Sequence, residues 1–130
     1  MTGLSWGGFY TMYVTAMSPF IKAAAPSAFF KDYDDILARA KDGKARSPDR
    51  DVAGGLRHAQ AIALICPRPC LVQMGEKDPV VPIAGARKET ESAASFYRKL
   101  GLAERYQFQV HDGGHVYDTK AILDFFERHL

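Results

Sequence analysis

The stretch GLSWGGFY, residues 3–10, follows the pattern G-x-S-x-G and adds a further glycine. This pattern usually surrounds a nucleophilic serine on a sharp turn between a strand and a helix. It therefore predicts that a helix begins after Ser5 and that the Ser5 hydroxyl stands at the start of that helix. Only Met1 and Thr2 precede the pattern, so the strand that normally leads into such a turn is expected to be missing.

The glycines of this stretch have a steric explanation. A turn this tight leaves no room for side chains two residues either side of the serine, so Gly3 and Gly7 are expected to prevent a collision with neighbouring backbone. Gly8 would let the following helix pack closely. The backbone N–H of Trp6 is expected to point at a developing oxyanion, because that donor comes from the residue after the nucleophile.

Downstream of the turn, segments with strand and helix patterns alternate along the chain. The clearest strand is PCLVQMG, residues 69–75, an apolar run bounded by prolines before it and by GEKDP after it. The segment YQFQV alternates apolar and polar residues, which indicates another strand. A third strand is expected within IKAAAPSAFF, where Pro26 marks its end or the rim of the sheet. The first expected helix follows Ser5 and ends near Met17. Four further helices are expected over residues 31–42, 56–65, 83–100 and 119–130, and residues 43–55 are expected to form a loop.

Strands that alternate with helices of this length imply parallel pairing with right-handed crossovers. The sequence therefore predicts an α/β fold with three parallel strands and flanking helices. No internal repeat, low-complexity segment or linker divides the chain, so residues 1–130 are expected to form a single domain.

Composition and charge exclude several classes of protein. The fractions of hydrophobic residues, 47%, and charged residues, 25%, are ordinary for a globular domain. A net charge of +2 without a basic block gives no reason to expect nucleic-acid binding, and no apolar run approaches the roughly 20 residues of a membrane helix. Cys66 and Cys70 lack the spacing of a redox or zinc site, and no His, Cys or carboxylate pattern indicates a metal. We therefore expect no cofactor, metal, nucleic acid or membrane partner.

Two further residues with catalytic chemistry follow predicted strands. Asp78 lies in GEKDP after the strand CLVQMG, and His115 lies in HDGGH after the strand FQV. The carboxyl ends of parallel strands meet at one edge of the sheet, where ligands bind. A serine hydroxyl needs an imidazole to accept its proton, and the imidazole needs an acid that holds its tautomer. Ser5, His115 and Asp78 are therefore expected to lie together as nucleophile, base and acid.

Other carboxylates compete for the role of the acid. Asp32 follows the strand expected within IKAAAPSAFF, so it is an alternative acid at the same edge of the sheet. Asp112 and Asp118 are so close to His115 in sequence that orienting its ring would be awkward. Asp78 itself is open to a simpler explanation as a turn residue, because Asp-Pro favours turns.

The remaining histidines and the aromatic pair Phe29-Phe30 have simpler explanations. His58 lies in a predicted helix and His129 next to the C-terminus, so both are expected to be solvated. His111, at the end of a strand, is expected to pack rather than to react, and Phe29-Phe30 to belong to the core or to a pocket wall.

Together, GLSWGG, PRPCLVQMGEKDPVVP and DGGH before a terminal amphipathic helix resemble the C-terminal half of an α/β-hydrolase. The order Ser, Asp, His along the chain is also that of this fold. The chain is most similar to bacterial esterases of the dienelactone hydrolase and acetyl xylan esterase-like group, and the resemblance covers nearly all of it. It implies that the three predicted strands are the sixth to eighth of the family sheet. By the same resemblance Ser5 matches the nucleophile, Asp78 the triad acid, His115 the base and Trp6 the oxyanion donor.

The chain departs from that family in length. Eight-stranded sheets of this kind run to roughly 200–250 residues, so the first five strands and the loop that supplies a second oxyanion donor are expected to be absent. The resemblance therefore implies an N-terminally incomplete α/β-hydrolase domain, with one sheet edge left open for self-association.

The resemblance implies hydrolysis of a small-molecule carboxylic ester through an acyl-enzyme, without a cofactor. A serine peptidase of the prolyl-oligopeptidase type, which shares this half of the fold, is one alternative, and a non-catalytic hydrolase fragment is another. With one oxyanion donor, the chain is expected to react weakly or not at all with a serine-directed probe. The sequence does not indicate the acyl group, the alcohol or the compartment.

Overall fold

The computed structural model describes residues 1–42 and 55–130, and it confirms the α/β prediction. A four-stranded sheet has the order β1-β2-β3-β4, and every neighbouring pair of strands is parallel. Helices cross from each strand to the next, as parallel pairing requires. The strands are β1 (Thr2–Leu4), β2 (Ala25–Ser27), β3 (Cys70–Gly75) and β4 (Tyr106–His111).

The sheet has one strand more than the three expected. Thr2–Leu4 pairs with Ala25–Ser27, and the N–H of Ala25 donates to the carbonyl of Met1 at 2.9 Å. The expectation that no strand leads into Ser5 is therefore wrong. Three residues are too few to show a periodic pattern, but they are enough to hydrogen-bond to a strand that is already in place.

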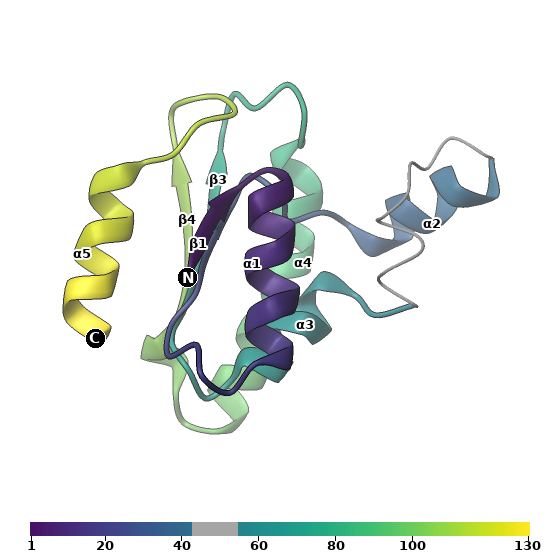
Figure 1. Ribbon diagram of the computed structural model, residues 1–130. Coiled ribbons are helices and arrows are strands. Elements are labelled where there is room, and N and C mark those ends of the chain that lie inside the picture. The colour runs from purple at the N-terminus through teal and green to yellow at the C-terminus, as the bar shows by residue number, and fades with distance from the viewer. Residues whose placement is uncertain (43–54) are drawn as a thin grey trace.

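Four helices lie in two layers on the two faces of the sheet, and α2 stands apart from both layers (Figure 1). α1, α3 and α4 pack together on one face, and α5 covers the other. The expected helix positions are confirmed, while the loop expected over residues 43–55 lies, apart from its last residue, outside the described residues. The helices are α1 (Trp6–Met17), α2 (Tyr33–Lys41), α3 (His58–Ile65), α4 (Ile83–Lys99) and α5 (Thr119–His129), and a short 3₁₀ helix, η1 (Ala103–Arg105), precedes β4.

Strand β3 is buried on both faces, which explains its nearly continuous apolar sequence. Val72 and Met74 belong to the core beneath α1, α3 and α4. Leu71 points the other way, into a smaller cluster with Ile122 and Phe125 of α5. Side chains alternate between the two faces of a strand, so Gln73 lies on the α5 side as the one polar side chain of this strand.

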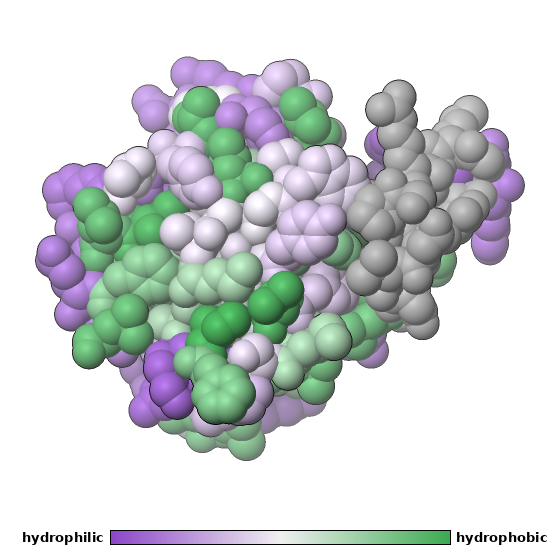
Figure 2. Space-filling model, in the orientation of Figure 1, coloured by the Kyte–Doolittle hydropathy of each residue, from purple (hydrophilic) through white to green (hydrophobic). Residues whose placement is uncertain are grey.

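Strands β1 and β4 form the two edges of the sheet. An apolar groove of about 360 Å³ lies between the β1 edge and α5, and Figure 2 shows apolar surface in the region between α5 and α1. The groove is lined by Thr2, Tyr117, Thr119, Ile122, Leu123 and Phe126.

Among the helices within residues 1–42 and 55–130, none is long and apolar enough to cross a membrane.

Candidate active site

Ser5 occupies the turn between β1 and α1, where the sequence places it. Its backbone has φ 57° and ψ −119°, a region that costs a non-glycine residue roughly 1–3 kcal/mol. Hydrogen bonds hold the residue on both sides: its N–H donates to the carbonyl of Ser27 at 2.9 Å, and its carbonyl accepts from the N–H of Phe9 at 3.0 Å. The strained turn predicted from G-x-S-x-G is therefore present.

The structure separates the roles of the three glycines. A Cβ at Gly3 would lie 2.2 Å from the carbonyl oxygen of Gly7, and a Cβ at Gly8 would lie 2.4 Å from that of Ser27. Both contacts are far too short, so these two expectations are confirmed. A Cβ at Gly7 would meet nothing within 4 Å. The steric expectation for Gly7 is therefore wrong. The backbone of Gly7 leaves no room for a side chain at Gly3, whereas the space around the Cβ position of Gly7 itself is open.

Asp78 lies in the loop after β3 with a fully buried carboxylate. Its Oδ1 accepts the N–H groups of Val80 at 2.7 Å and Val81 at 3.0 Å, and its Oδ2 lies 2.8 Å from Nδ1 of His115. Burial by itself raises the pKa of this carboxyl, but the two amides and His115 outweigh burial and hold the pKa below its usual value. Asp78 is therefore a carboxylate at neutral pH.

His115 lies in the loop after β4, and its side chain is 24% exposed. Because Asp78 is ionised, the neutral imidazole donates from Nδ1 to Oδ2. The lone pair of Nε2 is then the one that can accept a proton from a nucleophile. An orienting carboxylate and a partly exposed ring are what general base catalysis requires.

The loops that hold Asp78 and His115 run side by side because two glycine segments touch. A Cβ at Gly75 would lie 2.1 Å from the carbonyl oxygen of Gly114. The N–H of Glu76 donates to the carbonyl of His111 at 2.8 Å, and that of Lys77 donates to the carbonyl of Gly113 at 3.0 Å. The glycines in MGEKDP and HDGGH were the available sequence signal for this close approach.

Ser5 lies at the same carboxyl edge of the sheet, following β1. Among the described residues, its side chain and that of His115 are not joined by a hydrogen bond, whereas Asp78 and His115 are. In the absence of a substrate, catalytic hydrogen bonds are often long and tighten only in the complex.

Trp6 is the first residue of α1, directly after Ser5. The N–H groups in the first turn of a helix have no acceptor within the helix, so the N–H of Trp6 is not used by α1. Trp6 is 44% exposed, and its indole packs against Phe29 at 5.2 Å and Phe9 at 5.9 Å between ring centroids. These aromatic contacts fix the residue that follows the serine.

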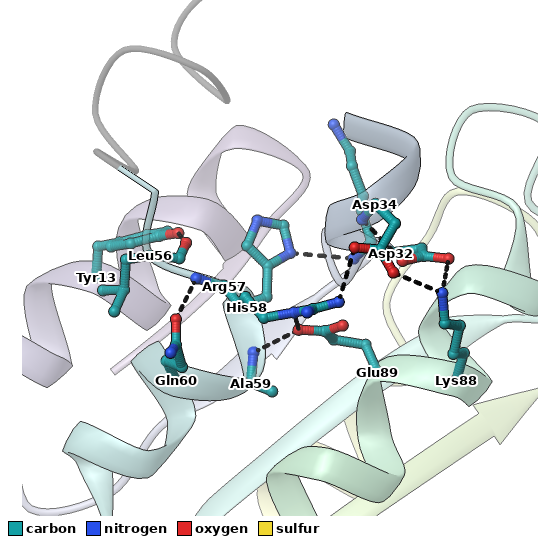
Figure 3. Close-up of polar contacts among 11 residues, drawn as sticks. Tyr13, Asp32, Asp34, Leu56, Arg57, His58, Ala59, Gln60, Lys88 and Glu89 are labelled. Atoms are coloured by element: carbon teal, nitrogen blue, oxygen red, sulfur yellow. Dashed lines mark hydrogen bonds and ion pairs between the residues drawn. The ribbon is translucent and has the colours of Figure 1, made fainter. Parts of the chain in front are cut away.

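The alternative acid, Asp32, has a different partner (Figure 3). Its Oδ2 lies 2.9 Å from Nζ of Lys88, and its Oδ1 accepts the N–H of Asp34 at 3.0 Å. Lys88 also bonds to Asp34 at 2.9 Å. Asp32 therefore links the start of α2 to α4 and does not orient a histidine.

His58 is 1% exposed, so the expectation that it is solvated is wrong. Its Nδ1 accepts the N–H of Lys31 at 3.1 Å, and its ring lies among those of Tyr13, Phe29 and Phe30. Burial, with a smaller effect of Lys31, lowers its pKa to about 3. The buried face of α3 begins at His58, which the sequence pattern did not show.

The other competitors near His115 have local roles. Asp118 accepts the N–H of Ala121 at 3.2 Å at the start of α5 and bonds to Nε2 of Gln109 at 2.7 Å. These two bonds hold the pKa of Asp118 below its usual value. Nδ1 of His111 accepts the N–H of Gly113 at 3.2 Å. Neither residue pairs with His115.

Within residues 1–42 and 55–130, no group of three or more His, Cys, Asp or Glu side chains is placed to hold a metal ion. Cys66 and Cys70 are free thiols, and burial raises the pKa of Cys70 far above its ordinary value. Cys70 therefore behaves as a small core residue.

The chain matches known proteins in its fold but not in its sequence. No protein-family model matches the sequence, and no curated protein matches it. A family 15 carbohydrate esterase, a glucuronoyl esterase from Caldicellulosiruptor kristjansonii, matches the fold with a TM-score of 0.76 at 21% identity, over 99% of this chain and 42% of that one.

Two further solved structures agree with this match. A glucuronoyl esterase from Teredinibacter turnerae has a TM-score of 0.72 at 20% identity, over 98% of this chain and 39% of its own. One from Sporotrichum thermophile has a TM-score of 0.71 at 14% identity, over 99% and 42%. The chain thus spans about two fifths of the length of these esterases. At such identities the likeness establishes the fold, and the chain has part of the α/β-hydrolase fold.

Proposed function

We propose that this chain contains the catalytic residues of a serine hydrolase acting on carboxylic esters. The observation that supports the proposal most directly is the 2.8 Å contact between Asp78 and Nδ1 of His115 at the carboxyl edge of the sheet. The strained turn of Ser5 at the same edge is the second support. The likeness to esterase structures agrees with this class of reaction.

In the proposed reaction, Oγ of Ser5 attacks the acyl carbon while Nε2 of His115 takes the hydroxyl proton. The N–H of Trp6 donates to the oxyanion, and Asp78 stabilises the imidazolium through Nδ1. When the tetrahedral intermediate collapses, the alcohol leaves with the proton from His115. Water, deprotonated by His115, then attacks the acyl-enzyme, releases the acid and restores Ser5.

The substrate class is proposed only as far as a carboxylic ester. The similar structures are glucuronoyl esterases, so uronate esters are reasonable substrates to test beside short-chain nitrophenyl esters. The finer resemblance to dienelactone hydrolases and acetyl xylan esterases stays a prediction. A peptidase of the prolyl-oligopeptidase type differs in the leaving group, so aminoacyl-proline amides distinguish it.

Labelling with a fluorophosphonate tests the nucleophile. We expect slow labelling of the native chain that maps to Ser5 and is abolished in Ser5→Ala. It should be slow because the N–H of Trp6 is the oxyanion donor proposed among the described residues, and a site with one donor fewer reacts about 100–1,000-fold more slowly. Ser95→Ala is a matched control, because the Ser95 hydroxyl bonds only to a carbonyl of its own helix, that of Ser92, at 2.7 Å.

Undiminished labelling of Ser5→Ala would exclude Ser5 as the nucleophile. A native chain that is not labelled at all would favour the alternative of a non-catalytic hydrolase fragment. In that case we expect turnover of neither the nitrophenyl and uronate esters nor the aminoacyl-proline amides.

Self-association through the open edge of β1 stays a prediction. The edge strand and the apolar groove beside α5 are compatible with it. Sedimentation velocity over a hundredfold range of concentration, without any label, would show a rising mass if it occurs. A constant monomer mass over that range would remove this prediction.

A further inference from the structure

Gln73 is a buried polar residue in the centre of an apolar strand. It lies in CLVQMG, and none of its surface is exposed. Burying a side-chain amide is unfavourable unless its donors and acceptors are all used. An apolar residue would pack at this position without that requirement. The hydrogen bonds of Gln73 must therefore explain why a glutamine stands here.

The amide of Gln73 is fully used, and half of its bonds go to one residue. Oε1 accepts the N–H of Asp118 at 2.9 Å and the hydroxyl of Ser27 at 3.3 Å. Nε2 donates to the carbonyl of Asp118 at 3.0 Å and to Oε1 of Gln109 at 2.7 Å. The side chain thus pairs with both backbone groups of Asp118, as a peptide group of a neighbouring strand would.

Asp118 ends the loop that holds His115. It lies three residues after His115 in the sequence and is the N-cap of α5, where its carboxylate accepts the N–H of Ala121. A second bond from Gln109 reaches the same carboxylate. Gln73 therefore fixes the point at which the loop stops and α5 begins.

The other end of the loop is fixed by backbone. The N–H of Lys77 donates to the carbonyl of Gly113, and Gly75 approaches Gly113 and Gly114 so closely that a Cβ would not fit. His115 lies between these two attachments. The position of its ring over Asp78 therefore depends on both ends of a short segment.

We propose that Gln73 is a positioning residue for His115. By holding the backbone of Asp118, it keeps Nδ1 of His115 at hydrogen-bond distance from Asp78. The proposal deepens the proposed function, since it concerns the base of the same site. It differs from a purely structural role, in which loss of Gln73 would lower stability and leave the His115–Asp78 contact as it is.

The variant Gln73→Met tests the proposal, because it keeps the length of the side chain and removes all four hydrogen bonds. Gln73→Leu is a second variant, apolar and of similar size, that also removes all four hydrogen bonds. Gln107→Met is the matched control: Gln107 is on β4 and bonds to Arg128 of α5 at 3.4 Å. The same substitution there disturbs α5 without touching the loop.

The measurement is the proton resonance of the His115 Nδ1–H in ¹⁵N-labelled protein, with His115→Gln for assignment. A proton shared with a carboxylate resonates far downfield. We expect this signal in the native chain and in Gln107→Met, and its loss or upfield shift in both Gln73 variants. Fluorophosphonate labelling of Ser5 should slow by up to about 100-fold in Gln73→Met, the scale expected for a small displacement of a catalytic group.

An unchanged resonance in folded Gln73 variants would overturn the proposal. Failure of both variants to fold would also overturn it, because Gln73 would then serve global stability. The resonance does not depend on reaction at Ser5. If Ser5 is never labelled, the proposed function fails, while the resonance still decides whether Gln73 positions His115.

Discussion

Two acid–histidine neighbourhoods lie near the carboxyl end of this sheet, and they have opposite properties. In the first, Asp78 is buried and bonds to His115, whose ring is partly exposed. In the second, Asp32 is paired with Lys88, and His58 is buried. Figure 3 shows the contacts of this second neighbourhood, which comprises Asp32, Asp34, Arg57, His58, Lys88 and Glu89.

In both neighbourhoods, the hydrogen-bond partner of Nδ1 decides what the histidine can do. Nδ1 of His58 accepts a backbone N–H, so the neutral ring is held and Nδ1 has no proton to share with a carboxylate. Nδ1 of His115 faces a carboxylate, which favours an N–H at that atom and stabilises the imidazolium. The first neighbourhood has the arrangement that the proposed proton transfer requires, and the second stabilises the fold.

The largest expected effect separates the two acids. Asp78→Asn should lower the rate of ester hydrolysis or of Ser5 labelling by about 10⁴-fold, because the amide no longer holds the required tautomer. Asp32→Asn should leave that rate within a factor of about two, since its side-chain partner among the described residues is a surface lysine. Rates measured at one pH on folded variants check this, and a reversed order would identify Asp32 as the acid.

A smaller effect is expected at Glu89, whose side chain is 2% exposed. Its Oε1 accepts the N–H of Ala59 at 3.0 Å in the first turn of α3. Glu89→Ala should reduce the free energy of unfolding by about 3 kcal/mol, because a buried donor loses its partner. Urea unfolding measures this, with Glu91→Ala on the exposed side of α4 as control. An equal loss in both variants would contradict a specific role of Glu89.

The pH dependence of stability should report His58. Its folded pKa, about 3, is below the ordinary histidine value of 6.5, so its contribution to stability is complete above pH 6.5 and falls as the pH decreases. At pH 5 the native chain should have lost about 2 kcal/mol of unfolding free energy through this residue.

His58→Asn keeps an acceptor for the N–H of Lys31 and cannot titrate in this range. Unfolding curves at pH 7.5 and pH 5 should therefore differ less for this variant than for the native chain. If both proteins lose the same free energy between these pH values, His58 is not the group responsible.

The smallest effect is expected at Lys88, which bonds to Asp32 and Asp34 with 57% of its side chain exposed. Solvent screens such pairs, so Lys88→Met should leave the urea midpoint nearly unchanged. The N–H bond between Asp34 and Asp32 remains in that variant. A large drop in the midpoint would mean that α2 depends on Lys88 for its attachment.

Features with a long local pattern were predictable from the sequence. β3 and β4 have clear strand patterns, α4 and α5 have helical periodicity, and G-x-S-x-G marks the turn at Ser5. The alternation of strands and helices was enough for parallel pairing, which brings the loops after β3 and β4 to one edge. The candidate pair Asp78 and His115 followed from that geometry.

Features that depend on a distant partner were not predictable. The three residues of β1 form a strand only because they can hydrogen-bond to the backbone of β2. The burial of His58 depends on rings contributed by α1 and by residues after β2. The use of Gln73 depends on a residue 45 positions away. In each case the deciding contact joins segments that no local pattern connects.

Trp6 is the only tryptophan of the chain, and it is bonded directly to Ser5. Its half-exposed indole rests on Phe29, so its emission is sensitive to a group placed beside it. An acyl or phosphonyl group on Oγ of Ser5 would be such a group. If the proposed acyl-enzyme forms, intrinsic fluorescence would therefore give a label-free optical signal that changes as the acyl group is attached and returns when water releases it.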